Sequence, residues 1–140
     1  MTDVLTPAAR SYNMSRIRSR DTKPEMRVRG LLHAMGLRYR LHVKDLPGKP
    51  DLVFPRARAV LFVHGCFWHM HRCRYGKPAP ATNSDFWARK RRSNAERDKR
   101  NRKLLRAAGW KVFEVWECAT RDENRLVQKL TPLVNFCRIT

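Results

Sequence analysis

The residues best suited to chemistry in this chain lie between positions 50 and 73. A lone carboxylate, Asp51, precedes a short apolar run, and a second apolar run at 59–63 leads directly into the string HGCFWHMHRC at 64–73. That string holds three histidines and two cysteines beside two large aromatic residues, a combination that no core strand requires. We therefore expect the functional site to lie where these two strands deliver their polar residues.

Asp51 is a candidate ligand for Mg²⁺, which prefers carboxylate, carbonyl and water oxygens and often bridges to a substrate phosphate. His64 and His69 follow the neighbouring strand. Because an imidazole titrates near neutral pH, either histidine could accept a proton from water. Asp51 alone would be interpreted as part of a Pro-Asp turn, and the nearby histidines favour the catalytic interpretation instead.

A second set of residues suits a different ion. Cys66, His71 and Cys73, together with the distant Cys118, supply the Cys₃His set that binds tetrahedral zinc. A loop so rich in aromatic residues cannot pack a core of its own, and zinc would hold it in place. The alternative is that these cysteines are buried free thiols, a state that we assign to Cys137.

Sequence patterns predict the elements that must position these groups. The capping-box pattern Thr22-x-x-Glu25 predicts a helix that ends near Gly36. Its predicted buried residues are Met26, Leu31, Leu32 and Met35. Glu25 could cap this helix or face Asp51, and spacing does not decide between the two.

The remaining elements follow from apolar alternation and turn residues. The predicted strands are residues 37–42, 52–54, 59–63 and 110–116, and the further helices are 84–108 and 122–136, with Pro132 bending or shortening the last. The two central strands are joined closely enough for a hairpin. The order αβββαβα predicts an α/β fold, a mixed β-sheet flanked by helices, as a single domain over residues 21–140.

The net charge of the chain indicates what kind of partner it binds. The chain has 31 Lys and Arg against 12 Asp and Glu, a net charge of +19, which favours a polyanion. Ten Lys or Arg lie between Arg89 and Arg106 against two acids, so this helix should track phosphates. Residues 1–20 form either a basic arm or a frayed tail. Because no apolar run suits a membrane span or signal peptide, we expect a cytoplasmic nucleic-acid-binding protein and no membrane partner.

Several motifs resemble a known family. Pro50-Asp51 with Phe62-x-His64 resembles the PD-(D/E)xK nuclease core, with Phe and His in the places of the acid and Lys. The string HGCFWH at 64–69 is similar to the very short patch repair (Vsr) endonucleases. Further matching segments, which extend the resemblance over nearly the whole chain, are residues 10–14, 20–22, 86–87, 94–98, 109–110 and 115–118.

The resemblance implies a restriction-endonuclease-like fold and a Mg²⁺-dependent, strand-specific DNA nicking endonuclease. Such an enzyme would cut 5′ of the thymine in a T:G mismatch left by deamination of 5-methylcytosine. It implies that Asp51 and the backbone carbonyl of Val63 bind Mg²⁺, that His69 is the general base, and that His64 and Glu25 support them. Family members can carry Thr in place of Val63, so any role of that hydroxyl would be lost here.

The resemblance also implies structural zinc on Cys66, His71, Cys73 and Cys118. The residues expected to contact or wedge into DNA are Met14, Phe67, Trp68, Trp87, Asn94 and Asp98. Aromatic wedges suit a mismatch, because unstacking costs least where pairing is already poor. An alternative for Phe67 and Trp68 is a hydrophobic plug on the end of the sheet.

Two other functions stay open from the residues alone. One is a restriction-type or junction nuclease that needs no mismatch, against which HGCFWH argues. The other is a non-catalytic, zinc-braced DNA-binding protein, which would leave Asp51, His64 and His69 without a role. We expect a monomer that binds double-stranded DNA, with mismatch-repair proteins as further partners.

Overall fold

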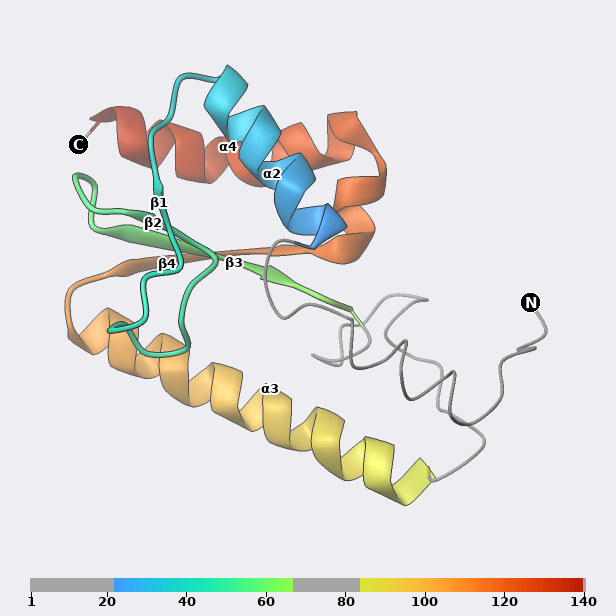
Figure 1. Cartoon of the computed structure of the whole chain (residues 1–140). Coiled ribbons are helices and arrows are strands. Elements are labelled where there is room, and N and C mark those ends of the chain that lie inside the picture. Colours follow the sequence, from blue (N-terminus) through green and yellow to red (C-terminus); the bar gives the residue numbers. More distant parts are fainter. Residues whose placement is uncertain (1–21, 67–83, 140) are drawn as a thin grey trace.

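The computed structural model describes residues 22–66 and 84–139 (Figure 1). In these ranges the elements are α2 (Lys23–Ala34), β1 (Arg40–Leu41), β2 (Leu52–Phe54), β3 (Ala59–His64), α3 (Ser84–Ala107), β4 (Lys111–Trp116), the 3₁₀ helix η1 (Glu117–Arg121) and α4 (Glu123–Ile139). The predicted order αβββαβα is confirmed, with η1 added between the last strand and the last helix. The basic arm predicted for residues 1–20 lies outside the described residues.

The four strands form one mixed sheet in the order β1-β2-β3-β4. The first three are antiparallel neighbours, and the register of the predicted hairpin pairs Leu52 with Leu61. Strands β3 and β4 are parallel, which requires a crossover, and α3 lies in that crossover. Their register pairs Phe62 with Glu114 and His64 with Trp116.

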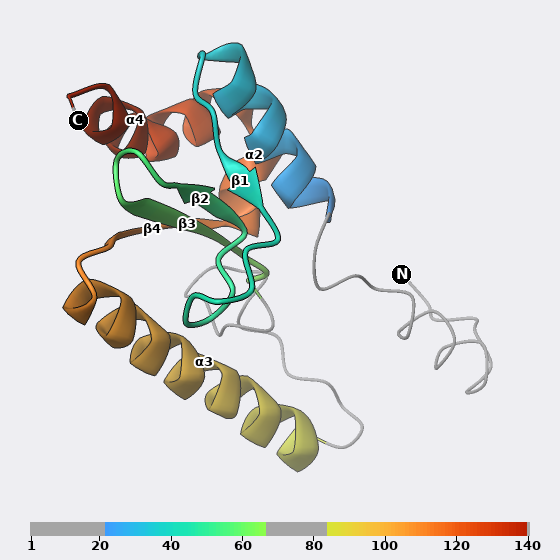
Figure 2. The ribbon, with the colours of Figure 1, turned by 60° about the vertical axis from the view of Figure 1, so that its left-hand side comes forward.

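Helices cover both faces of the sheet (Figures 1 and 2). On one face α2 and α4 pack over a large apolar cluster that includes Leu32, Leu61 and Leu130. On the other face Leu105 of α3 packs with Val60 and a few further residues of β2 and β3 in a smaller cluster. Because successive strand side chains point to opposite faces, neighbouring residues of β3 contribute to different clusters.

Helix α2 confirms the predicted start but corrects the predicted buried face. The Thr22 hydroxyl accepts a hydrogen bond from the Glu25 backbone N–H at 3.4 Å, as expected for an N-cap. The buried residues are Glu25, Val28, Arg29 and Leu32, whereas Met26 is 53% exposed and Leu31 and Met35 are half-buried. The apolar pattern alone misplaces this face, because two charged side chains lie on it.

Two other boundaries differ from prediction. The strand predicted for 37–42 shortens to Arg40–Leu41, and His42 adopts a left-handed φ of 58° that ends the extended conformation. Helix α4 continues to Ile139 with Pro132 inside it, because the buried Leu130, Leu133 and Val134 hold it against the sheet. Among the described residues, no helix has both the length and the apolar character that a membrane crossing requires.

Candidate active site

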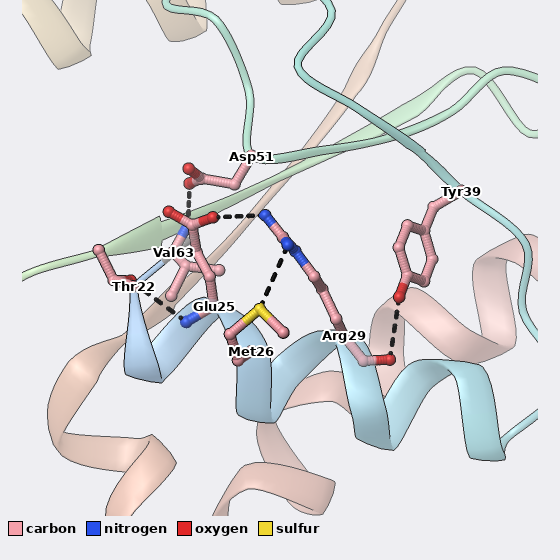
Figure 3. Close-up of polar contacts among 7 residues, drawn as sticks. All are labelled: Thr22, Glu25, Met26, Arg29, Tyr39, Asp51 and Val63. Carbon is pink, nitrogen blue, oxygen red and sulfur yellow. Dashed lines mark hydrogen bonds and ion pairs between the residues drawn. The ribbon is translucent and has the colours of Figure 1, made fainter. Parts of the chain in front are cut away.

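Asp51 immediately precedes strand β2, and its carboxylate connects two strands. Its Oδ2 atom accepts a hydrogen bond from the backbone N–H of Val63 at 2.6 Å (Figure 3). The hairpin register brings them together, because Leu52 pairs with Leu61 and the residues beyond that pair must face each other. This hydrogen bond holds Asp51 beside the end of β3, where His64 is also placed.

Glu25 of α2 points toward Asp51 (Figure 3). Its Oε2 atom accepts a hydrogen bond from Nη2 of Arg29 at 2.9 Å, one helical turn later. Both are buried, Glu25 at 2% and Arg29 at 9% exposure. The carboxylate thus faces Asp51, as a supporting role requires, while the hydroxyl of Thr22 caps the helix. Sequence reasoning missed Arg29, although its i,i+4 spacing from Glu25 indicates such a pair.

The buried Glu25 influences the ionisation of the half-buried Asp51. Burial, together with the charge of Glu25 and a hydrogen bond to it, raises the pKa of Asp51 to about 8, against the opposing effects of the Val63 N–H and the Arg29 charge. Asp51 is therefore largely protonated near pH 7 when no cation is bound. A divalent cation would replace that proton and compensate both carboxylates.

The donor atoms at this place suit Mg²⁺ better than a softer ion. Asp51 and Glu25 offer carboxylate oxygens, and Val63 lines the same cavity. In residues 22–66 and 84–139, no cluster of three or more His, Cys, Asp or Glu side chains is arranged around one point. A cation here would keep positions for water or substrate oxygens, as protein-bound Mg²⁺ usually does. The Val63 carbonyl as a ligand stays a prediction.

His64 is buried at the end of β3, with 4% exposure. Its Nε2 atom lies 2.6 Å from Oε2 of Glu114 on β4, and Nη1 of Arg102 on α3 lies 3.1 Å from the same oxygen. The imidazole stacks on Phe62 at a ring distance of 5.6 Å and lies 4.7 Å from the ring of Trp116.

Glu114 determines which ring nitrogen of His64 carries the hydrogen. Burial alone would raise the pKa of Glu114, but the hydrogen bond and charge of His64, together with Arg102, hold that pKa below its ordinary value. An ionised carboxylate can only accept, so Nε2 of His64 must be the donor. In the neutral imidazole, Nδ1 is then the atom that can take a proton. Sequence reasoning missed Glu114, although it is the single acid in the strand KVFEVW.

These groups share one cavity of about 680 Å³. Its lining includes Glu25, Asp51, Val63, His64 and Asp98, and also the loop between β1 and β2. The structure therefore brings together the described members of the predicted catalytic set. The predicted general base His69 lies outside the described residues.

Two of the four predicted zinc ligands meet in the fold. The Cys66 sulfur accepts a hydrogen bond from the Cys118 backbone N–H at 3.4 Å, although the two residues are 52 positions apart. Both cysteines are buried, with Cys66 just beyond β3 and Cys118 in η1. His71 and Cys73 lie outside the described residues, so zinc binding stays a prediction, as does the alternative of buried thiols.

Helix α3 carries the described part of the predicted DNA-contacting set. Trp87, Asn94 and Asp98 are partly buried along one face, and Trp87 packs edge-on against the exposed ring of Phe86. The exposed basic residues of α3 are Arg89, Lys90, Arg92, Arg97, Lys99, Arg100, Lys103 and Arg106. The other predicted contacts, Met14, Phe67 and Trp68, lie outside the described residues.

The mixed sheet, the facing carboxyl groups of Asp51 and Glu25 and the cationic helix define an α/β enzyme suited to a polyanionic substrate. Comparison with known proteins identifies the family. The family described as DNA mismatch endonuclease Vsr matches residues 2–75. The chain belongs to this family of endonucleases.

Three relatives illustrate the similarity. A protein from Xanthomonas oryzae pv. oryzae, named type II nicking enzyme V.XorIIP, is 50% identical over 96% of this chain and 98% of its own length. The DNA mismatch endonuclease Vsr of Escherichia coli is 46% identical over 92% of this chain and 82% of its own length. The type II nicking enzyme V.NmeAIP of Neisseria meningitidis is 43% identical over 96% of this chain and 100% of its own length.

Proposed function

We propose that this protein is a Mg²⁺-dependent endonuclease that nicks one DNA strand 5′ of the thymine in a T:G mismatch. The observation that carries the proposal is the meeting of Asp51, Glu25 and His64 in one cavity beside a cationic helix. The relatives support it, since one is named a mismatch endonuclease and two are named nicking enzymes. The strands and flanking helices are also consistent with a restriction-endonuclease-like core.

In this proposal the chain's own residues hold and orient the reacting groups. Asp51 and Glu25, with the carbonyl of Val63, would hold Mg²⁺, which stabilises negative charge on the phosphate and lowers the pKa of water. His69 would accept the proton of the attacking water. His64, oriented by Glu114, would present Nδ1 toward the reacting phosphate group.

Zinc and the aromatic residues would serve recognition. Cys66 and Cys118, with His71 and Cys73, would bind structural zinc and tie the segment after β3 to η1. Phe67, Trp68 and Trp87 would stack between bases, with Met14 entering from the other groove, and Asn94 and Asp98 would contact the same DNA. Each base stacked on an aromatic ring returns about 1–3 kcal/mol. We further propose a monomer that acts in the cytoplasm, with mismatch-repair proteins as partners.

The test is a nicking assay on labelled duplexes that differ in one pair, T:G against C:G and T:A, in Mg²⁺ at fixed salt. We expect a nick only in the T strand of the T:G duplex, lost in Asp51→Ala and His69→Ala. Lys129→Gln, an exposed residue of α4, is the control and should nick normally. Cutting of all three duplexes would replace the mismatch proposal by a general nuclease. Binding without any cutting would refute the catalytic proposal.

A further inference from the structure

The loop between β1 and β2, residues 42–50, lines the same cavity as the carboxylates but carries the opposite charge. His42, Lys44 and Lys49 are exposed and belong to the cavity lining. Asp45, the one acid of the loop, does not. The cavity therefore combines Glu25 of α2, Asp51 just before β2 and Asp98 of α3 with two lysines from a single loop.

Packing against α3 holds this loop in place. Val43 and Leu46 pack onto the small apolar cluster that contains Leu105. The backbone N–H of Lys49 donates to the Leu46 carbonyl at 3.1 Å. Gly48 has a left-handed φ of 76°, and an added Cβ would lie 3.0 Å from Nδ2 of Asn101, so both the backbone and the close approach to α3 favour glycine here.

Two residues of this loop adopt a backbone conformation that is costly for a residue with a side chain. His42 and Lys49 have left-handed φ values of 58° and 48°, which L side chains rarely adopt. A loop that served only as a connection would be expected to place glycine or asparagine at such positions. Unusual backbone of this kind concentrates at functional sites, where the surrounding packing maintains it.

The charge of the two lysines is not used within the described part of the chain. Glu25 pairs with Arg29, and Asp51 accepts from Val63. Neither Lys44 nor Lys49 forms an ion pair or side-chain hydrogen bond with any residue of 22–66 or 84–139. An anionic ligand in the cavity would therefore meet two exposed, uncompensated ammonium groups.

We propose that this loop, which we call the 42–50 loop, is a second phosphate-binding site in which Lys44 and Lys49 bind a DNA backbone phosphate. The inference rests on the proposed function and deepens it. Lys49 is separated from Asp51 by Pro50 alone, so a strand whose scissile phosphate lies at Asp51 has an adjacent phosphate near the loop. Such contacts position the strand without reading its sequence.

The test measures binding rather than cutting. Full-length protein is titrated into labelled T:G and C:G duplexes in buffer without Mg²⁺ by fluorescence anisotropy, from 50 to 200 mM salt. The variants are Lys44→Gln, Lys49→Gln and the double variant. Lys129→Gln is the matched control, because it removes the same charge from α4, which covers the other face of the sheet (Figure 1).

We expect the slope of log K against log salt to become shallower by about 0.9 for each phosphate that the variant no longer binds. The weakening should be equal on both duplexes, absent in Lys129→Gln, and largely reversed in the Lys44→Arg/Lys49→Arg variant. Gly48→Ala, which keeps both lysines but strains the left-handed backbone of the loop beside Asn101, should also weaken binding. Circular dichroism verifies that each variant is folded.

A double variant that binds both duplexes with wild-type affinity and slope would overturn the inference. So would a weakening that the Lys129→Gln control reproduces. Failure of the proposed function is separable, because it would appear as absent or mismatch-independent nicking by the wild-type protein. The binding experiment without Mg²⁺ does not depend on nicking.

Discussion

The Nε2 atom of His64 lies 2.6 Å from Oε2 of Glu114, and the same oxygen contacts Arg102. Three elements meet in this chain of contacts, since His64 ends β3, Glu114 lies on β4 and Arg102 lies on the cationic helix α3. A buried histidine in the candidate site is thus oriented by an acid that itself contacts the helix expected to lie along DNA.

Removal of the Glu114 carboxylate should impair nicking by releasing the His64 ring. Glu114→Gln keeps an acceptor but loses the charge, and we expect kcat to fall about tenfold, since a charge-assisted hydrogen bond exceeds a neutral one by about 1–1.5 kcal/mol. Glu114→Ala should cost more. Long-range ¹⁵N NMR should show His64 with Nε2–H in the wild type and a mixture of tautomers in Glu114→Ala. An unchanged rate and spectrum in Glu114→Ala would contradict the assignment.

Asp51 should make the metal-free protein less stable as pH rises. Its pKa of about 8 in the folded state exceeds the unfolded value of 3.8, so between these values the folded state binds a proton that the unfolded state releases. The free energy of unfolding contributed by this group therefore declines from about pH 4 to about pH 8. Thermal unfolding without added Mg²⁺ should show the decline for the wild type and a flatter profile for Asp51→Asn.

Binding of Mg²⁺ should offset the loss of stability that the metal-free protein shows as pH rises. Because the cation binds the ionised carboxylates, the rise in Tm on adding Mg²⁺ should be larger at pH 8 than at pH 6. Asp51→Asn should lose most of that rise, and Glu123→Gln, an exposed change on α4, should keep it. An equal rise in Tm at both pH values would show that Mg²⁺ does not compete with the proton on Asp51.

The buried pair of Glu25 and Arg29 should be a sensitive point for stability. Arg29→Met leaves the buried Glu25 carboxylate without its partner charge, and we expect a decrease of about 3–5 kcal/mol in the free energy of unfolding. Glu25→Gln/Arg29→Met should recover part of this decrease, because it removes the uncompensated charge. Urea unfolding of the two variants measures the difference. If the second change recovered nothing, the cause would be poorer packing rather than charge.

Zinc content should distinguish a metal site from buried thiols. We expect about one zinc per chain in the purified protein, absent from Cys66→Ser and from Cys118→Ser. Cys137→Ser is the control, since burial raises the pKa of the Cys137 thiol and disfavours the thiolate that binds metal. Elemental analysis measures the metal, and chelation should lower Tm. A wild-type protein without zinc would favour the buried-thiol interpretation.

The order of elements, the hairpin and the position of Asp51 and His64 at strand ends could all be predicted from the sequence. These features depend on contacts between residues close in the chain, namely apolar periodicity, capping and turn residues. The HGCFWH string also indicated the family, because so unusual a run of residues is specific without any knowledge of the fold.

The tertiary structure decided which distant groups meet. Glu25 could have served only its own helix, but the packing of α2 on the sheet turns it toward Asp51 (Figure 3). The parallel register of β3 and β4 places Glu114 beside His64. The fold also brings the Cys66 sulfur within hydrogen-bonding distance of the Cys118 backbone, 52 positions away in the sequence. Local patterns carry no information about such contacts, because register and helix packing arise from the whole core. The same packing buries the charged face of α2 and leaves Met26 exposed, against the prediction from its apolar residues.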